Sequence, residues 1–222
     1  MAAIRAVGVD VGETLVDETG VWGDWADWLG IPWFTFFGAL GGAIARGMDH
    51  RDVFELVRPG IDLDAERRAR QAAGRRRGVT AADLYPDALP CLRALIAAGS
   101  RVGIAGNQPH ETEAVLRALD LPLALVASSE RWGVAKPDRA FFSRIVDELG
   151  PEPGEIAYVG DRLDNDIGPA VAAGMTAIFI RRGPWAIIQS ALVDPLSVGA
   201  HAVIESLAEL PDRIARLASG EA

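Results

Sequence analysis

The sequence predicts an α/β fold: a Rossmann-like core with a parallel sheet and helices on both faces, plus an inserted helical segment. Two observations predict it. Short apolar runs of strand length alternate with longer stretches of helical periodicity, which is typical of parallel sheets with crossover helices. The alternation is broken between Asp17 and Tyr85, where the chain shows helical periodicity without a clear strand pattern. That stretch is too long for a loop, so we interpret it as an insert after the first strand.

Six apolar runs are the predicted strands, and the last of them is the shortest. They cover residues 4–9, 101–105, 123–127, 156–159, 176–180 and 202–204. The predicted core helices cover residues 87–98, 110–119, 138–149, 167–173 and 207–217. Gly99, Gly150 and Gly174 directly follow three of these helices, where glycine commonly ends a helix. The predicted domains are therefore a core of residues 1–16 and 87–222 and a helical insert of residues 17–86.

The composition is that of an ordinary globular protein of 222 residues, half of them hydrophobic and 24% charged. A net charge of −9 argues against a nucleic-acid-binding surface. The uncharged stretch of residues 28–45 approaches transmembrane length, but Pro32 and several glycines interrupt it, so we expect no membrane association. The lone cysteine, Cys91, excludes an internal disulfide. With no signal peptide predicted, we expect a cytoplasmic protein, either a monomer or a homodimer.

Polar residues gather directly after three of the predicted strands. Asp10 follows the first strand, Gly106 and Asn107 follow the second, and an acidic loop of residues 160–166 follows the fourth. In open α/β sheets, functional groups collect at the carboxyl ends of the strands. A carboxylate at such a position can act as a nucleophile or as a ligand for a hard metal ion. The pattern therefore predicts a site at this edge of the sheet.

Lys136 is the only lysine among 22 basic residues, and it lies just ahead of the helix after the third strand. A chain that otherwise uses arginine is expected to keep a lysine where a compact ammonium is needed, although chance codon use is an alternative. Two strand-end carboxylates with a lysine nearby suit Mg²⁺ and phosphate. Each motif alone also has a structural explanation as a turn or a helix start. The ordered set, each member after its own strand, favours the functional interpretation.

In this order the motifs resemble the four motifs of the haloacid dehalogenase-like hydrolase superfamily. The matching segments are residues 10–15, 106–107, 136–137 and 160–166. The insert is similar in position and helical character to the superfamily's C1 cap, so it is expected to be an inserted helical cap domain. The resemblance implies a phosphatase that acts on a small phosphorylated metabolite in two steps: Asp10 attacks phosphorus to form an aspartyl-phosphate, and water then cleaves it.

The resemblance also implies a metal site and a phosphate site. Mg²⁺ would be held by Asp10, the backbone carbonyl of Gly12 and Asp161, with Asp166 as a further ligand or as support. Lys136 would orient the nucleophile and stabilise the charge of the phosphoryl group. Backbone N–H groups at Gly106 and Asn107 would contact phosphate.

The chain departs from the family's pattern at two positions. Gly12 stands where the phosphatases carry an aspartate that acts as general acid and base, and Gly106 stands where a serine or threonine binds phosphate. Loss of a general acid typically costs ~10²–10⁴ in rate. We therefore expect a slow phosphatase or one for good leaving groups, with a water or a substrate group as acid; Glu13 is not expected to replace it. The alternatives are a non-catalytic relative that binds a phosphorylated ligand or a partner, and a dehalogenase-type hydrolase.

The insert is rich in tryptophan and phenylalanine. We expect these side chains to form the small core of the insert; the alternative is that some line an apolar substrate pocket. Arg46, His50 and Arg51 are candidates for contact with a polar substrate group.

Overall fold

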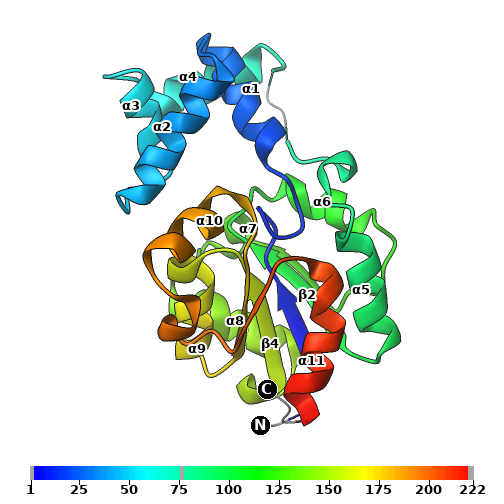
Figure 1. Cartoon of the computed structure of the whole chain (residues 1–222). Helices are drawn as coiled ribbons and strands as arrows, with labels where there is room; N and C mark the ends of the chain where they lie inside the picture. Colours follow the sequence, from blue (N-terminus) through cyan, green and yellow to red (C-terminus); the bar gives the residue numbers. More distant parts are fainter. Residues whose placement is uncertain (1–2, 76–77, 220–222) are drawn as a thin grey trace. The chain divides into compact units, whose positions relative to one another are not determined.

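The computed structural model describes residues 3–75 and 78–219 and divides the chain into two compact units. One unit consists of Met1–Asp17 and Thr80–Ala222, and the other is Glu18–Val79. The first unit is an α/β core and the second is helical, so the predicted fold class is confirmed, with the helical insertion placed between the first two strands (Figure 1).

The core unit contains a six-stranded sheet in the order β3-β2-β1-β4-β5-β6, and every neighbouring pair is parallel. Its strands are β1 Ala6–Val9, β2 Arg101–Gly106, β3 Leu125–Ser128, β4 Ile156–Gly160, β5 Thr176–Ile180 and β6 Ala202–Ile204. All six predicted strands are present: β5 and β6 have the predicted ends, and the ends of the other four differ by at most two residues. In the register, Val9 lies beside Ile104 of β2 and Val159 of β4, so the carboxyl ends of these three strands are adjacent.

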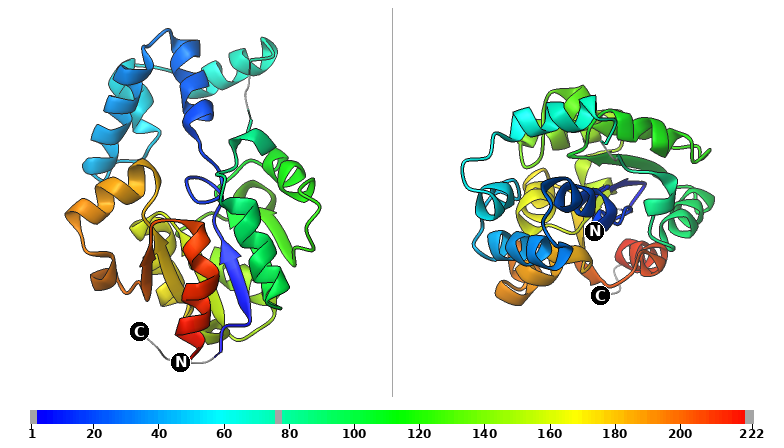
Figure 2. Two further views of the ribbon diagram at one scale, coloured as in Figure 1. Left: turned by 45° about the vertical axis from the view of Figure 1, so that its right-hand side comes forward. Right: turned by 90° about the horizontal axis from the view of Figure 1, so that it is seen from above.

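Helices cover both faces of the sheet (Figures 1 and 2). The core helices are α5 Ala88–Ala97, α6 Glu111–Arg117, α7 Ser129–Trp132, α8 Arg139–Leu149, α9 Gly168–Ala172, α10 Gly183–Leu192 and α11 Leu210–Ser219. Helices α5 and α11 lie on one face, and α8 and α9 lie on the other. The core beneath α8 is aromatic: Phe141 and Phe142 are fully buried, and Phe142 packs edge-on against Tyr158 of β4 at 5.3 Å between ring centroids. Burial of such large apolar rings is a major contribution to the stability of a fold.

Two core helices were not predicted from the sequence. Helix α7 is a single turn, too short to show a helical period. Helix α10 follows β5 and begins with Gly183 and Pro184. Proline is favoured in the first turn of a helix, because the backbone N–H that it lacks would have no partner within the helix there. Pro184 was therefore the feature of the sequence from which the start of α10 could have been predicted. Short turns complete the unit: η1 Ala81–Asp83, η2 Pro153–Glu155, η3 Leu163–Ile167, η4 Pro195–Val198 and η5 Leu207–Glu209.

The chain leaves and re-enters the core unit through two paired linkers. The backbone N–H of Asp17 donates to the carbonyl of Asp83 at 2.8 Å, and the N–H of Tyr85 donates to the carbonyl of Leu15 at 2.9 Å. These bonds place residues 80–86 in the core unit, whereas the sequence had placed them at the end of the insert. The paired segment is only a few residues long, so it carries no strand periodicity that the sequence could reveal.

The helical unit consists of α1 Thr19–Leu29, α2 Trp33–Ala45, α3 Asp52–Val57 and α4 Leu63–Ala72. Its aromatic side chains pack together: the Phe54 ring lies 4.7 Å from the Trp25 ring and 5.9 Å from the buried Phe36 ring, between centroids. Arg70 is buried with its guanidinium 3.7 Å above the ring of Trp25 and paired with Asp24. These contacts agree with the interpretation of the aromatic residues as the core of the insert.

Among the described helices, none is by itself long and apolar enough to cross a membrane. Helices α1 and α2 pass that test of length and composition only as a pair, with a bend of 115° between them.

Candidate active site

The candidate site begins at the end of the central strand of the sheet. Asp10 directly follows β1, and its backbone N–H donates to the carbonyl of Val159 at 2.9 Å. The residue is 6% exposed. The backbone of Asp10 is therefore held against β4, which fixes the position from which its carboxylate extends at the carboxyl end of the sheet.

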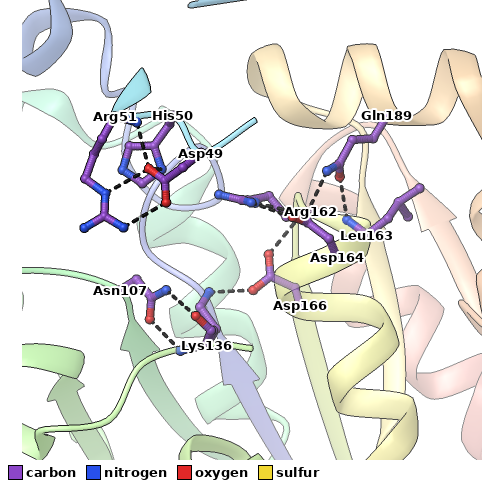
Figure 3. A network of polar contacts seen from close by, with 10 residues as sticks. All are labelled: Asp49, His50, Arg51, Asn107, Lys136, Arg162, Leu163, Asp164, Asp166 and Gln189. Atoms are coloured by element: carbon purple, nitrogen blue, oxygen red, sulfur yellow. Dashed lines mark hydrogen bonds and ion pairs between the residues drawn. The ribbon is translucent and has the colours of Figure 1, made fainter. Parts of the chain in front are cut away.

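Lys136 lies between two carboxylates. Its Nζ is 2.6 Å from Oδ1 of Asp10 and 2.5 Å from Oδ1 of Asp166. Asn107 holds the lysine from the other side, because its side chain accepts from the N–H of Lys136 at 2.8 Å and donates to the carbonyl of Lys136 at 2.9 Å (Figure 3). The Asn107 side chain thus contacts the backbone of the lysine, a contact that the sequence did not suggest.

Asp161 and Asp166 come from the loop after β4. The N–H of Arg162 donates to Oδ2 of Asp166 at 3.0 Å, which turns this carboxylate inward over Gly160. A Cβ at position 160 would lie 2.6 Å from Cβ of Asp166, so only glycine leaves room for it. Asp10, Asp161 and Asp166 are all buried, and each offers one oxygen within 4.8 Å of the others.

The charge of this cluster is unbalanced. Three ionised carboxylates against one ammonium leave an excess of negative charge in a buried space, which is strongly unfavourable. Burial and the charges of Asp166 and Asp10 raise the pKa of Asp161 well above its usual range. Burial likewise raises the pKa of Asp166 to about 6, against the lowering effect of Lys136. Burial alone would lower the pKa of Lys136, but the two facing carboxylates outweigh it and raise that pKa well above its ordinary value.

The donor set fits a hard divalent cation. Oδ2 of Asp161 is buried and has no hydrogen-bond partner among the described residues, although buried carboxylate oxygens are nearly always paired. Oxygen ligands from carboxylates are those that Mg²⁺ prefers, and a divalent charge would compensate the excess. The cluster of Asp10, Asp161 and Asp166 can therefore hold such an ion.

Gly106, at the end of β2, lies against the nucleophile candidate. A Cβ at this position would be 2.7 Å from Oδ1 of Asp10 and 3.0 Å from Cγ2 of Val11. Asp10 thus occupies the space that a side chain at position 106 would need. The departure from serine or threonine at this position is explained sterically in this chain.

Glu13 is hydrogen-bonded to Tyr85 through its side chain. Its backbone lies in the left-handed region, with φ 52°, and its Oε2 accepts from the hydroxyl of Tyr85 at 2.7 Å. The neighbouring Gly12, which has no side chain, forms an isolated β-bridge with Val16 through its backbone. That Glu13 does not replace the missing acid stays a prediction.

A network around Tyr85 was missed by sequence reasoning. The guanidinium of Arg182 lies 4.1 Å from the Tyr85 ring centroid, donates to the carbonyl of Thr14 at 3.0 Å and pairs with Asp87. Asp87 also accepts from the Ser206 hydroxyl at 2.6 Å. These residues come from four separate loops, so no local spacing in the sequence connects them.

Arg162 and Asp164 form a second group beside the cluster. The guanidinium of Arg162 binds both carboxylate oxygens of Asp164 at 3.1 and 2.6 Å, and Gln189 of α10 donates to the same carboxylate at 2.7 Å (Figure 3). The Oε1 of Gln189 accepts from the N–H of Leu163 at 2.7 Å. The network fixes the loop that carries Asp161 and Asp166.

Arg46 and Arg51, which were predicted as candidates for contact with a polar substrate group, form hydrogen bonds within the helical unit. Arg51 donates to both oxygens of Asp49 at 2.8 Å, and Arg46 donates to the carbonyl of Gly42 at 2.9 Å. A hydrogen bond from Arg51 lowers the pKa of Asp49 well below its usual range, against the effect of burial.

A parallel sheet with acidic groups at the carboxyl ends of β1 and β4, and a lysine against them, has its candidate site where doubly wound α/β proteins bind their ligands. A family model described as haloacid dehalogenase-like hydrolase matches residues 4–174. The chain belongs to this family, as its motifs predicted.

Two curated relatives are phosphatases. The chain is 38% identical over 104 residues to a glyceraldehyde 3-phosphate phosphatase of Methanopyrus kandleri, covering 46% of this chain and 45% of the relative. It is 34% identical over 135 residues to a phosphoglycolate phosphatase of Rhodospirillum rubrum, covering 59% of this chain and 53% of the relative. The chain thus matches only about half the length of each of these two relatives.

Solved structures share the fold. The putative HAD-hydrolase YfnB of Bacillus subtilis, which was solved bound to magnesium, superposes with a TM-score of 0.70 at 18% identity, covering 96% of this chain and 99% of that one. At this level of identity the likeness concerns the fold alone.

Proposed function

We propose that this protein is a Mg²⁺-dependent phosphatase acting on a small phosphorylated metabolite. The observation that carries the proposal is the buried cluster of Asp10, Asp161 and Asp166 with Lys136 between two of its members. The family membership and the phosphatase activity named for two relatives support it. The substrates named for those relatives make a small phosphate monoester the first class to test.

Asp10 is the proposed nucleophile. One of its carboxylate oxygens attacks phosphorus, the bond from phosphorus to the leaving oxygen breaks, and an aspartyl-phosphate forms. Water then attacks the same phosphorus, the bond to Asp10 breaks, and inorganic phosphate is released. Lys136 keeps its charge, orients Oδ1 of Asp10 and stabilises negative charge on the phosphoryl oxygens.

Mg²⁺ would be held by Asp10, Asp161 and the backbone carbonyl of Gly12, with Asp166 as a further ligand or support. When bound, the ion supplies positive charge that neutralises the carboxylates and polarises the phosphoryl group. Backbone N–H groups at Gly106 and Asn107 are the proposed phosphate contacts. The leaving oxygen takes its proton from water or from the substrate, because position 12 carries no acid.

The dehalogenase-type alternative agrees with the glycine at position 12, but it leaves the buried metal-binding geometry of Asp161 and Asp166 without a role. A non-catalytic binding protein would retain the same geometry but would release no phosphate. Both alternatives are therefore separable from the proposal by activity and by its dependence on Mg²⁺.

The test is phosphate release from a panel of aryl and alkyl phosphates, with Mg²⁺ or with EDTA. Asp10→Asn is the blank, because it keeps the size of the side chain and removes the nucleophile. We expect release that requires Mg²⁺ and disappears in Asp10→Asn, with circular dichroism showing an intact fold. Release that survives in Asp10→Asn would contradict the mechanism. Mg²⁺ binding without any release from the panel would favour a binding role.

A further inference from the structure

A further buried carboxylate lies in the turn after β1, outside the chemistry described above. Glu13 is 6% exposed, and its Oε2 accepts from the hydroxyl of Tyr85 at 2.7 Å. Its side chain lies over Gly183, where a Cβ would be only 2.7 Å from Cβ of Glu13. Burying a carboxylate is unfavourable unless hydrogen bonds hold it, so the enclosure of Glu13 needs an explanation.

The backbone conformation of Glu13 is a second feature that needs an explanation. Its φ of 52° is in the left-handed region, which glycine adopts easily and most other residues avoid. A glutamate kept in this conformation must be held there by its contacts. The structure supplies two such contacts: Tyr85 on the side chain and the carbonyl of Val16, which accepts from the N–H of Glu13 at 2.7 Å.

These contacts fix the direction of the Gly12 carbonyl. The peptide bond between Gly12 and Glu13 is planar and trans, so the carbonyl of Gly12 points opposite to the N–H of Glu13. The N–H of Glu13 is held by the carbonyl of Val16, and the Cα of Glu13, which lies in the same peptide plane, is held through its side chain by Tyr85. The Gly12 carbonyl therefore cannot rotate unless one of these bonds breaks.

Tyr85 is itself firmly placed. Its backbone N–H donates to the carbonyl of Leu15, and the guanidinium of Arg182 lies 4.1 Å from its ring centroid. Arg182 is anchored in turn by the carbonyl of Thr14 and by Asp87. Burial and the charge of Glu13 raise the pKa of the Tyr85 phenol, which keeps the hydroxyl as a donor.

We propose that Glu13 and Tyr85 are positioning residues that hold the Gly12 carbonyl in place as a ligand for the divalent cation. The proposal rests on the proposed function, because that function assigns the carbonyl to Mg²⁺. Neither side chain touches the substrate or the reacting atoms. Their role is to hold the turn in one conformation, so that the backbone carbonyl of Gly12 stays directed at the ion.

The experiment measures Mg²⁺ binding to the full chain by isothermal titration calorimetry, with no substrate present. Tyr85→Phe keeps the ring beside Arg182 and removes only the hydroxyl. Glu13→Gly removes the carboxylate and also accepts the left-handed backbone without strain, so the turn itself remains accessible. We expect each variant to weaken Mg²⁺ binding about tenfold, the lower end of the range for groups that orient metal ligands.

Two further variants separate positioning from general stabilisation. The combined variant Tyr85→Phe with Glu13→Gly is expected to bind Mg²⁺ no more weakly than either single variant, because both break the same hydrogen bond. Glu13→Gln keeps an oxygen that accepts from Tyr85, so its affinity is expected to stay close to that of the unsubstituted chain. Ser206→Ala, which removes a hydrogen bond at the far end of the same network, is the matched control.

Thermal unfolding of every variant accompanies the titrations. Ser206→Ala is expected to lower the melting temperature while leaving the Mg²⁺ affinity unchanged. If Tyr85→Phe and Glu13→Gly also lower only the melting temperature, the positioning role is overturned and the phosphatase proposal stands. If the unsubstituted chain binds no Mg²⁺, both proposals are overturned.

Discussion

Asp161 and Asp87 are two carboxylates of the core unit with opposite surroundings. Asp87 is partly buried, and its oxygens accept from Arg182, from the Ser206 hydroxyl and from the N–H of Leu207. Asp161 is buried among other carboxylates, and in the part of the chain that the structure describes its Oδ2 has no hydrogen-bond partner. Burial would raise the pKa of Asp87, but its donors outweigh burial and lower that pKa. Burial and neighbouring negative charge raise the pKa of Asp161 instead.

The difference separates a carboxylate whose oxygens are satisfied within the fold from one that, under the proposed function, is kept for a cation. A network whose polar groups are all satisfied rigidifies its surroundings. A buried oxygen without a partner is costly and is retained where something else, such as a cation, pairs with it. Substitutions around Asp161 should therefore change activity, whereas substitutions around Asp87 should change stability.

The largest expected effect is at Lys136. Lys136→Met removes the only cation of the described residues that contacts both Asp10 and Asp166, and we expect kcat/KM to fall by about 10³, as for loss of a strong charge-stabilising group. Lys136→Arg should not restore activity, because a planar guanidinium does not fit a fully buried space shaped for an ammonium. Steady-state kinetics in Mg²⁺ check both variants. Recovery in Lys136→Arg would mean that charge alone is needed.

At Asp87 the effect should fall on stability. Asp87→Asn weakens the ion pair with Arg182, and we expect the free energy of unfolding at pH 7 to fall by about 2 kcal/mol. This is less than for a fully buried pair because the carboxylate is partly exposed to solvent. kcat should stay within a few-fold of the unsubstituted chain. Urea unfolding and kinetics check the two parts, and an activity loss as large as at Lys136 would break the comparison.

The same variant has a defined dependence on pH. The pKa of Asp87 is lower in the folded than in the unfolded chain, so its ionised form stabilises the fold above the unfolded pKa, near 3.8. This contribution is lost as the pH falls through the folded value. The difference in stability between the unsubstituted chain and Asp87→Asn should therefore be constant from pH 6 to 8 and shrink below about pH 4. Urea unfolding at these pH values measures it.

Gly106 tests the steric part of the site. Gly106→Ser restores the hydroxyl that is usual in the family, but its Cβ would meet Oδ1 of Asp10 at 2.7 Å. We expect kcat/KM to fall about tenfold, as for a small displacement of a reacting group. Gly106→Ala adds the same Cβ without the hydroxyl and should lose a similar amount. A gain in Gly106→Ser alone would show that the missing hydroxyl, rather than the position of Asp10, limits phosphate binding.

A gain in activity, rather than a loss, is expected at Gly12. If leaving-group protonation limits the rate, Gly12→Asp should speed the cleavage of alkyl phosphates by about tenfold, below the ~10²–10⁴ typical of an evolved general acid. Aryl phosphates, whose leaving groups need less protonation, should change less. Gly12→Asn has nearly the same size and no proton to give, so it is the control. An equal response of both substrate classes would contradict the explanation.

Much of the fold follows from local patterns. The six strands were predictable because each is a short apolar run bounded by polar loops, and Gly150 ends α8 in the left-handed conformation expected of a glycine cap. Helix α7 and the pairing of residues 83–85 with the first linker were not predictable. Both are too short to carry a period, and the pairing depends on hydrogen bonds between segments far apart in the chain.

The sequence by itself determined which functional residue follows which strand, because Asp10, Gly106, Lys136 and Asp161 each come after a different predicted strand. Since the strands of a parallel sheet all end at one edge, these residues were expected to lie at the same edge. Only the tertiary structure decided which atoms meet there. It placed Lys136 against two carboxylates, left Oδ2 of Asp161 without a hydrogen-bond partner in residues 3–75 and 78–219, and brought the side chain of Glu13 to Tyr85. The physical reason is that periodicity fixes which face of an element is buried, whereas contacts between loops depend on distances that no spacing along the chain encodes.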